Sequence, residues 1–182
     1  MPAYTDTFNQ FAAVGVIAMQ VVIFLIAANL LFFRSRENKF LLFFKKFGFY
    51  IGFLVSFGAM ALSLFYSNVI GFPACELCYV QRIFLYPQVI LFGMELYKRD
   101  RTMIDFSMAL AFFGTITSLF HLYIENGGES SLDCATGGKA AISCAARYVY
   151  EFGYITVPVM ALTTSVFIII LLVNYKYMSR QA

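Results

Sequence analysis

The chain has 182 residues, of which 61% are hydrophobic and only 13% are charged. A soluble domain of this length has no core large enough to hide so much apolar surface, so the composition indicates an integral membrane protein. The formal net charge of +3 comes with no phosphate-binding loop and no aromatic stacking platform, so we expect no nucleic-acid partner.

Five apolar segments follow one another along the chain. Each is long enough to cross a hydrocarbon layer of roughly 30 Å, which takes about 20 helical residues. In lipid, the backbone of a continuous apolar run must satisfy its own hydrogen bonds, so these runs predict helices and not barrel strands. The segments span residues 11–33, 47–66, 79–97, 103–124 and 154–175. The sequence therefore predicts an all-α membrane protein.

The first segment has a leader, MPAYTDTFNQ, without lysine or arginine. Its apolar run is also longer than the core of a secretory signal, so we expect a genuine transmembrane helix there. Its two notable polar residues, Gln20 and Asn29, are expected to serve helix packing or the interface and not to bind a ligand.

Basic residues orient the predicted helices. They gather in the connections 34–46 and 98–101 and in the C-terminal tail. By the positive-inside rule these regions face the cytoplasm and its anionic lipid, which places the C-terminus inside. The N-terminus and the connection around Gly71 have no lysine or arginine, and the outer loop 125–153 has only Lys139 and Arg147. These regions are predicted to lie outside.

All four cysteines fall on the predicted outer side: Cys75, Cys78, Cys134 and Cys144. The outer face of a bacterial membrane, or the lumen of the endoplasmic reticulum, permits disulfides, whereas the cytosol reduces them. Two pairs are what two disulfides require. The simplest interpretation is a non-catalytic membrane protein whose two disulfides brace the outer loops.

The first pair has features that a structural disulfide does not need. Cys75 and Cys78 form a C-x-x-C at a predicted helix start, where the positive end of the helix dipole favours a thiolate. If the helix begins before Cys75, both cysteines and Arg82 line one face, with Arg82 about 6 Å deeper than Cys78. Such a cation can stabilise a thiolate or the oxygen of a ligand being reduced. Alternatively, Arg82 extends to the lipid headgroups.

His121 is the only histidine, and it is predicted to lie at about the depth of Arg82. Together they would give an apolar pocket one polar corner, which suits a flat molecule with carbonyl oxygens; otherwise His121 is an interfacial residue without chemistry. A c-type haem is excluded because Tyr79, not histidine, follows Cys78. Nine residues separate Cys134 from Cys144, unlike a zinc knuckle, so no metal is predicted.

The motif CELCYVQR and its continuation RIFLYPQ, with FHLY around His121 and GYITVPVM at the last helix, resemble the DsbB family of bacterial disulfide-forming quinone reductases, including its shorter-looped BdbC type. The resemblance covers about residues 47–175. The vitamin K epoxide reductase family, a related alternative, has its loop cysteines before the membrane C-x-x-C, whereas here Cys75 and Cys78 come first.

The resemblance implies a multi-pass protein of the bacterial cytoplasmic (inner) membrane, with its redox cysteines on the periplasmic or extracellular side. A reduced DsbA-like thioredoxin-fold partner would attack the loop disulfide at Cys134, and Cys144 or the helix pair would resolve the mixed disulfide. Electrons would pass to Cys75 and Cys78 and then to a quinone, either ubiquinone or menaquinone. Cys78 would contact the quinone ring and Cys75 would exchange with the loop.

In the same scheme, Arg82 would stabilise charge on a quinone oxygen, and His121 would hold or protonate the other side. The chain then divides into residues 1–46, an extra N-terminal helix with its basic connection, and residues 47–182, a DsbB-like four-helix bundle carrying the redox loop 125–153. Two departures from the family are the extra helix and Gln81, which stands where some relatives have a carboxylate. Glu95 and Asp105 are expected to be solvated helix ends.

Overall fold

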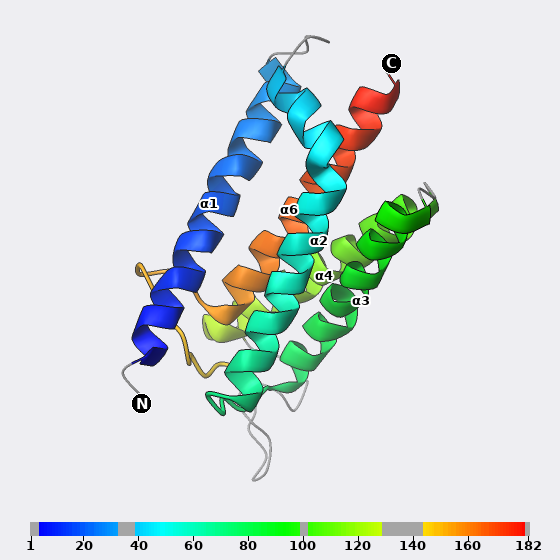
Figure 1. Cartoon of the computed structure of the whole chain (residues 1–182). Helices are drawn as coiled ribbons and strands as arrows, with labels where there is room; N and C mark the ends of the chain where they lie inside the picture. Colours follow the sequence, from blue (N-terminus) through cyan, green and yellow to red (C-terminus); the bar gives the residue numbers. More distant parts are fainter. Residues whose placement is uncertain (1–3, 33–38, 99–101, 129–143, 181–182) are drawn as a thin grey trace.

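The computed structural model describes residues 4–32, 39–98, 102–128 and 144–180. Within these ranges the chain forms five long helices (Figure 1). They are α1 (Tyr4–Phe32), α2 (Lys39–Asn68), α3 (Glu76–Lys98), α4 (Thr102–Glu125) and α6 (Val157–Arg180). All five are long and apolar enough to cross a membrane. The predicted all-α membrane fold is therefore confirmed.

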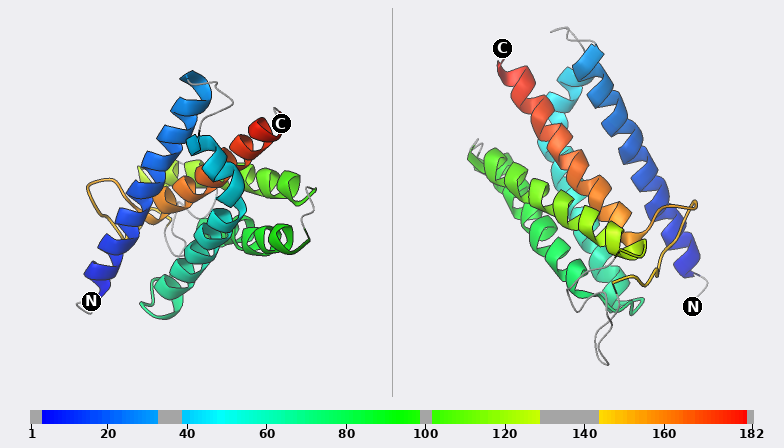
Figure 2. Two further views of the ribbon diagram at one scale, coloured as in Figure 1. Left: turned by 45° about the horizontal axis from the view of Figure 1, so that its top comes forward. Right: turned by 180° about the vertical axis from the view of Figure 1, so that it is seen from behind.

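Helices α2, α3, α4 and α6 form a four-helix bundle, with α4 packed on α3 and α6, and α2 packed on α3 and α6. Helix α1 packs mainly along α6 and meets α2 less extensively, for example where the ring of Phe8 lies against that of Phe65. Viewed from behind, α6 lies between α1 on one side and the α3–α4 pair on the other (Figure 2). Helix α6 is accordingly the most buried of the five spans.

Because consecutive helices run in opposite directions, the N-terminus and the C-terminus lie at opposite ends of the bundle (Figure 1). The end of α2, the start of α3, the end of α4 and the start of α6 all gather at the end where α1 begins. We call this the redox end, since it carries Cys75, Cys78 and His121. The predicted match in depth between the start of the third helix and the end of the fourth is confirmed.

Away from the redox end the helices approach closely. Gly52 of α2 lies against Phe92 of α3, where an added Cβ would be 2.5 Å from the ring atom Cε1 of Phe92. Gly114 of α4 faces Ser165 of α6, whose hydroxyl oxygen would be 3.0 Å from such a Cβ. Phe92 and Ile168 belong to one buried apolar cluster that joins α3, α4 and α6. Small residues at these crossings allow the close contact on which helix association in lipid depends.

Polar side chains fasten the helices to one another. Gln88 of α3 donates to the carbonyl of Ser107 on α4 at 2.9 Å. Gln20 of α1 donates to the hydroxyl of Thr163 on α6 at 3.2 Å and accepts from the hydroxyl of Tyr154 at 2.7 Å. Gln20 is thus a packing residue, in agreement with the sequence prediction. Asn29 donates to the carbonyl of Leu25 within its own helix.

The two acidic residues expected at solvated helix ends differ. Asp105 is exposed and pairs with Lys176 of α6. Glu95 is only 6% exposed, so the prediction for it is wrong. The face of α3 that carries Glu95 also carries the buried residues Gln88 and Phe92, because these positions are spaced three or four residues apart.

Candidate functional site

The chain enters α3 through a short extended segment that ends at Cys75. Gly71, with a φ of 82°, turns the backbone after α2. The carbonyl of Cys75 accepts a hydrogen bond from the amide of Tyr79 at 3.2 Å, so Cys75 is the N-cap of the helix and Glu76 is its first residue. The sequence analysis placed Cys75, Cys78 and Arg82 on one helix face on the condition that the helix begins before Cys75. This condition is not met. Cys75 nevertheless lies at the positive end of the helix dipole.

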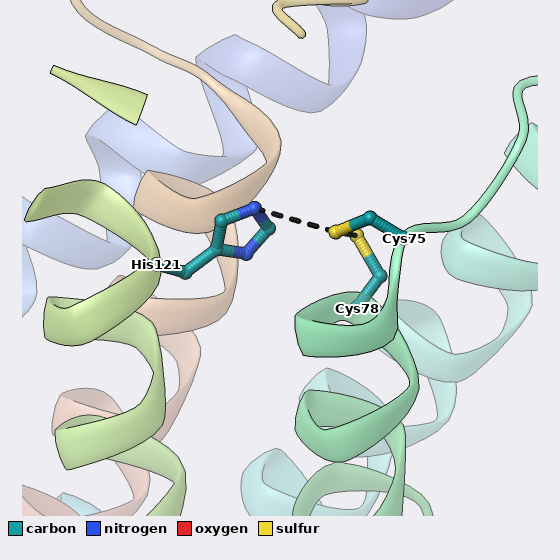
Figure 3. A group of neighbouring side chains, drawn as sticks. All are labelled: Cys75, Cys78 and His121. Atoms are coloured by element: carbon teal, nitrogen blue, oxygen red, sulfur yellow. Dashed lines mark hydrogen bonds between the residues drawn. The ribbon is translucent and has the colours of Figure 1, made fainter. Parts of the chain in front are cut away.

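Three side chains meet at this point (Figure 3). The sulfur atoms of Cys75 and Cys78 are 3.4 Å apart. The Nε2 atom of His121, from α4, lies 3.7 Å from the sulfur of Cys75. Cys75 and His121 are 6% and 3% exposed. The sequence analysis placed His121 only at about the depth of Arg82; its contact with Cys75 is a finding of the structure.

These neighbours stabilise the thiolate of Cys75. The hydrogen bond from the Cys78 thiol is the largest cause that lowers the pKa of Cys75 below its ordinary value, and His121 adds a smaller contribution through a hydrogen bond and its charge. Burial acts in the opposite direction but is outweighed. A thiolate is the nucleophile in thiol–disulfide exchange. Cys75 is therefore the better nucleophile of the pair.

Arg82 is held from the neighbouring helix α2. Its Nε donates to the hydroxyl of Ser63 at 3.0 Å, and its Nη2 donates to the carbonyl of Ser63 at 3.3 Å. Its guanidinium also lies over the ring of Tyr79, 5.3 Å from the centroid. Tyr86 adds a hydrogen bond to the hydroxyl of Ser63 at 3.2 Å. These contacts fix the cation inside the bundle and not at the lipid headgroups.

A cavity of about 620 Å³ joins these groups. Cys75, Cys78, Arg82 and His121 all line it. Most of the remaining lining is apolar and comes from α1, α2 and α6. Arg82 and His121 both line this cavity, as the predicted polar corner requires. The hydrogen bonds of Arg82 go to Ser63 and not to either cysteine.

Of the second cysteine pair, the structure describes Cys144, which is disulfide-bonded. Cys134 lies outside the described residues, so its predicted pairing stays a prediction. The carbonyl of Cys144 lies 3.3 Å from the Nε2 atom of His121. Cys144 also packs in one buried cluster with Cys75. One end of the second pair is thereby placed next to the first.

Glu125 at the end of α4 holds the segment that follows Cys144. Its Oε1 lies 3.4 Å from the Nε of Arg147, and its Oε2 accepts from the hydroxyl of Thr156 at 2.8 Å. The Glu125 side chain is only 3% exposed. The sequence analysis did not single out Glu125 or Ser63; an acid at the end of an apolar run was the only signal for Glu125, and Ser63 gave none.

Cys75, Cys78 and His121 also form a group of potential metal ligands, because their two sulfur atoms and one ring nitrogen all lie within 4.8 Å of one another. Two thiolates and an imidazole are a donor set that zinc accepts. The sequence prediction of no metal considered only the four cysteines. It stays a prediction, and the chemistry of the reduced pair must be tested with metal content measured.

A bundle of apolar helices that brings a C-x-x-C pair, a histidine and a disulfide-bonded cysteine together at one end defines a membrane thiol–disulfide oxidoreductase. The family model described as "Disulfide bond formation protein DsbB" matches residues 45–174, and the chain belongs to this family. The predicted resemblance is thus confirmed.

Two relatives from Bacillus subtilis (strain 168) illustrate the similarity. The chain is 32% identical over 130 residues to "Disulfide bond formation protein C", covering 70% of this chain and 91% of that protein. It is 39% identical over 117 residues to "SPbeta prophage-derived disulfide bond formation protein B", covering 64% of this chain and 76% of that protein.

A relative from Bacillus anthracis, "Probable disulfide formation protein C 1", is 32% identical over 128 residues, which cover 70% of this chain and 87% of that protein. No solved structure matches the chain. The family match begins within α2 and ends within α6, so α1 lies outside it.

Proposed function

We propose that this protein oxidises a DsbA-like thioredoxin-fold partner on the outer side of a bacterial cytoplasmic membrane and passes the electrons to membrane quinone. One observation carries the proposal. The reduced pair Cys75 and Cys78 opens into an apolar cavity that also holds the fixed cation Arg82. At the same end of the bundle, His121 contacts the carbonyl of Cys144, the described member of the second pair.

The exchange between the two pairs follows from this arrangement. The partner would attack Cys134, which leaves Cys144 as a thiol, and Cys144 would then attack the disulfide form of Cys75 and Cys78. Cys144 and Cys75 are both buried members of one cluster, and Cys78 is partly buried against it. His121, between them, can give a proton to the thiolate that leaves or take one from the thiol that attacks.

The residues around the cavity fit a quinone. Its apolar lining suits a ring and a tail, while Arg82 would stabilise negative charge on a ring oxygen and His121 would supply a hydrogen bond or a proton. A bound quinone supplies the capacity to accept two electrons and two protons. Overall, two thiols of the partner become one disulfide, and the electrons and protons they lose convert the quinone to a quinol.

The direction of the bundle in the membrane is proposed on the distribution of basic residues, which places the redox end, and with it the N-terminus, outside. The oxidising side of the membrane is also the side on which a newly formed disulfide persists. Two alternatives remain: a non-catalytic protein with structural disulfides, and an enzyme that acts like a vitamin K epoxide reductase.

The test measures the ultraviolet absorbance of a quinone mixed with purified protein and a reduced DsbA-like partner, with wild type and Cys78→Ser compared. We expect the quinone band to disappear only when the partner is present, and Cys78→Ser to abolish its loss. The preparation is checked for zinc, so that an inhibited metal-bound form is recognised.

Thiol trapping distinguishes the first alternative, since structural disulfides stay oxidised when the reduced partner is added. No loss of the quinone band with ubiquinone or with menaquinone would contradict the proposal. Reduction of an epoxide substrate in place of quinone would favour the second alternative.

A further inference from the structure

The cavity extends far beyond the redox residues. One of its walls is α1, which lies outside the family match, and another is the facing side of α2. The residues that line these two walls include Phe11, Gly15 and Met19 of α1 and Val55, Gly58 and Leu62 of α2. Helix α6 contributes further lining, including Met160 and Ala161. The cavity thus continues from Cys78 and Arg82 into an apolar space between α1 and α2.

Glycines open this space from both walls. An added Cβ at Gly15 meets nothing within 4 Å, and the same is true at Gly58. This contrasts with Gly52, where a Cβ would collide with the ring of Phe92. Gly15 and Gly58 therefore do not serve close helix packing. Their missing side chains leave room inside the cavity.

Helix α1 is held at a fixed place while this space stays open. The hydroxyl of Tyr66 on α2 donates to Asn9 at 2.9 Å, on the N-terminal side of Gly15. On its C-terminal side, Gln20 bonds to Thr163 and Tyr154. The apolar clusters that bury α1 join it to α6 and also include residues of α2, among them Tyr66 and Phe44. Anchors on both sides of Gly15 keep α1 from closing against α2.

We propose that α1 and α2 form a binding channel for the isoprenoid tail of the quinone, and that α1 makes the protein selective for long tails. This inference rests on the proposed function, because it takes Cys78 and Arg82 as the place of the ring. The observation that carries it is that a single cavity is lined both by Cys78 and Arg82 and by apolar residues of α1 and α2. A volume of 620 Å³ is in the range of about 300–1,000 Å³ typical of whole ligands and exceeds the needs of a single ring.

A phospholipid acyl chain shares the chemistry of an isoprenoid tail, so the experiment must distinguish the two sources. The probes are ubiquinone and menaquinone, each with one and with four isoprenoid units. Their dissociation constants are measured by quenching of tyrosine fluorescence, because the chain has twelve tyrosines and no tryptophan. The proteins are held in phospholipid nanodiscs of one composition, so that partition of each quinone is the same for every variant.

The variants Gly15→Leu and Gly58→Leu fill the channel from its two walls. Ala18→Leu is the matched control. Ala18 is exposed on α1 and does not line the cavity, so the larger side chain adds its volume outside it. We expect both channel variants to weaken binding of the four-unit quinone about tenfold and that of the one-unit quinone less than twofold. The control should bind both as wild type does, and circular dichroism should show equal helix content in all four proteins.

Three results would overturn the inference. The first is a four-unit quinone that binds the channel variants as tightly as the control. The second is a loss of copurified phospholipid in the channel variants with unchanged quinone binding, which would assign the space to an acyl chain. The third is that the wild-type protein binds none of the four quinones. This third result would also contradict the proposed function, whereas the first two would not.

Discussion

The two ends of the bundle are built in opposite ways. Around Gly52 and Phe92 the helices touch so closely that one added carbon would overlap a ring. Toward the redox end, Gly15 and Gly58 face open space, and the side chains that meet are sulfur, imidazole, carboxylate and guanidinium groups. The comparison suggests a division of labour, in which the close-packed end fixes the helices and the open end retains room for a ligand. Each prediction below tests one side of this comparison.

The largest effect is expected at Arg82. Arg82→Met removes the cation but keeps the length of the side chain. We expect quinone reduction to slow roughly 100-fold, as is typical when one group that stabilises an oxyanion is lost. Exchange with the thioredoxin-fold partner, measured by stopped flow without quinone, should change little. Equal quinone reduction in wild type and Arg82→Met would show that Arg82 serves only its structural contacts with Ser63 and Tyr79.

The close-packed end should respond in stability and not in redox chemistry. Gly52→Leu forces a side chain into the ring of Phe92, and overpacking of this kind costs about 1–3 kcal/mol. Gly58→Leu, in the same helix but facing the cavity, should cost much less. Thermal denaturation in one detergent, followed by circular dichroism, measures the pair. Equal midpoints for the two variants would remove the distinction between the two ends.

The thiolate of Cys75 gives a prediction that depends on pH. Because its pKa is lowered, Cys75 of the reduced protein should be alkylated by iodoacetamide at pH values where an ordinary thiol is protonated and unreactive. His121→Gln removes one of the two partners that lower this pKa, so the pKa should rise and the rate at pH 6 should fall, by roughly tenfold.

Cys78→Ala removes the larger cause and should lower this rate further. The measurement uses protein with Cys134 and Cys144 changed to serine, so that only the helix pair reacts. A rate that is independent of both substitutions would mean that the helix start alone sets the reactivity of Cys75.

The smallest effect is expected at Glu125. Glu125→Gln keeps the hydrogen bond to Thr156 but weakens the ion pair with Arg147. We expect tryptic cleavage after Arg147 to become about threefold faster, because the segment leaves its place on α4 more often. Thr117→Val, at a half-buried position of the same helix, is the control. An unchanged cleavage rate would show that Thr156 alone holds the segment.

The helices and part of the site could be predicted from sequence because both follow from local patterns. Apolar runs located all five spans, although the helices extend beyond them, since polar residues such as Lys39 and Asn68 continue the hydrogen bonding outside the hydrocarbon layer. The match in depth between His121 and Arg82 was predicted from the alternating directions of the helices, whereas the contact of His121 with Cys75 was not predicted. Local patterns left open whether the third helix begins before Cys75, and the structure has it begin at Glu76.

Other features depend on which faces pack together, and no local pattern shows this. Ser63 holds Arg82 only because α2 and α3 are in contact. The burial of Glu95 likewise depends on the neighbours of its helix and not on its nearness to the helix end. The width of the space between α1 and α2 depends on how α1 lies against α6.

The central place of α6 has a consequence for how the protein is made. Translation delivers the N-terminal helices to the membrane first, yet three polar contacts of α1 and α2 have their partners in α6. Gln20 bonds to Thr163, the carbonyl of Leu41 accepts from Asn174, and Lys45 donates to the carbonyl of Met178. Until the last helix leaves the ribosome these groups lack their final partners. A nascent chain truncated before α6 should therefore be an early target for membrane proteases.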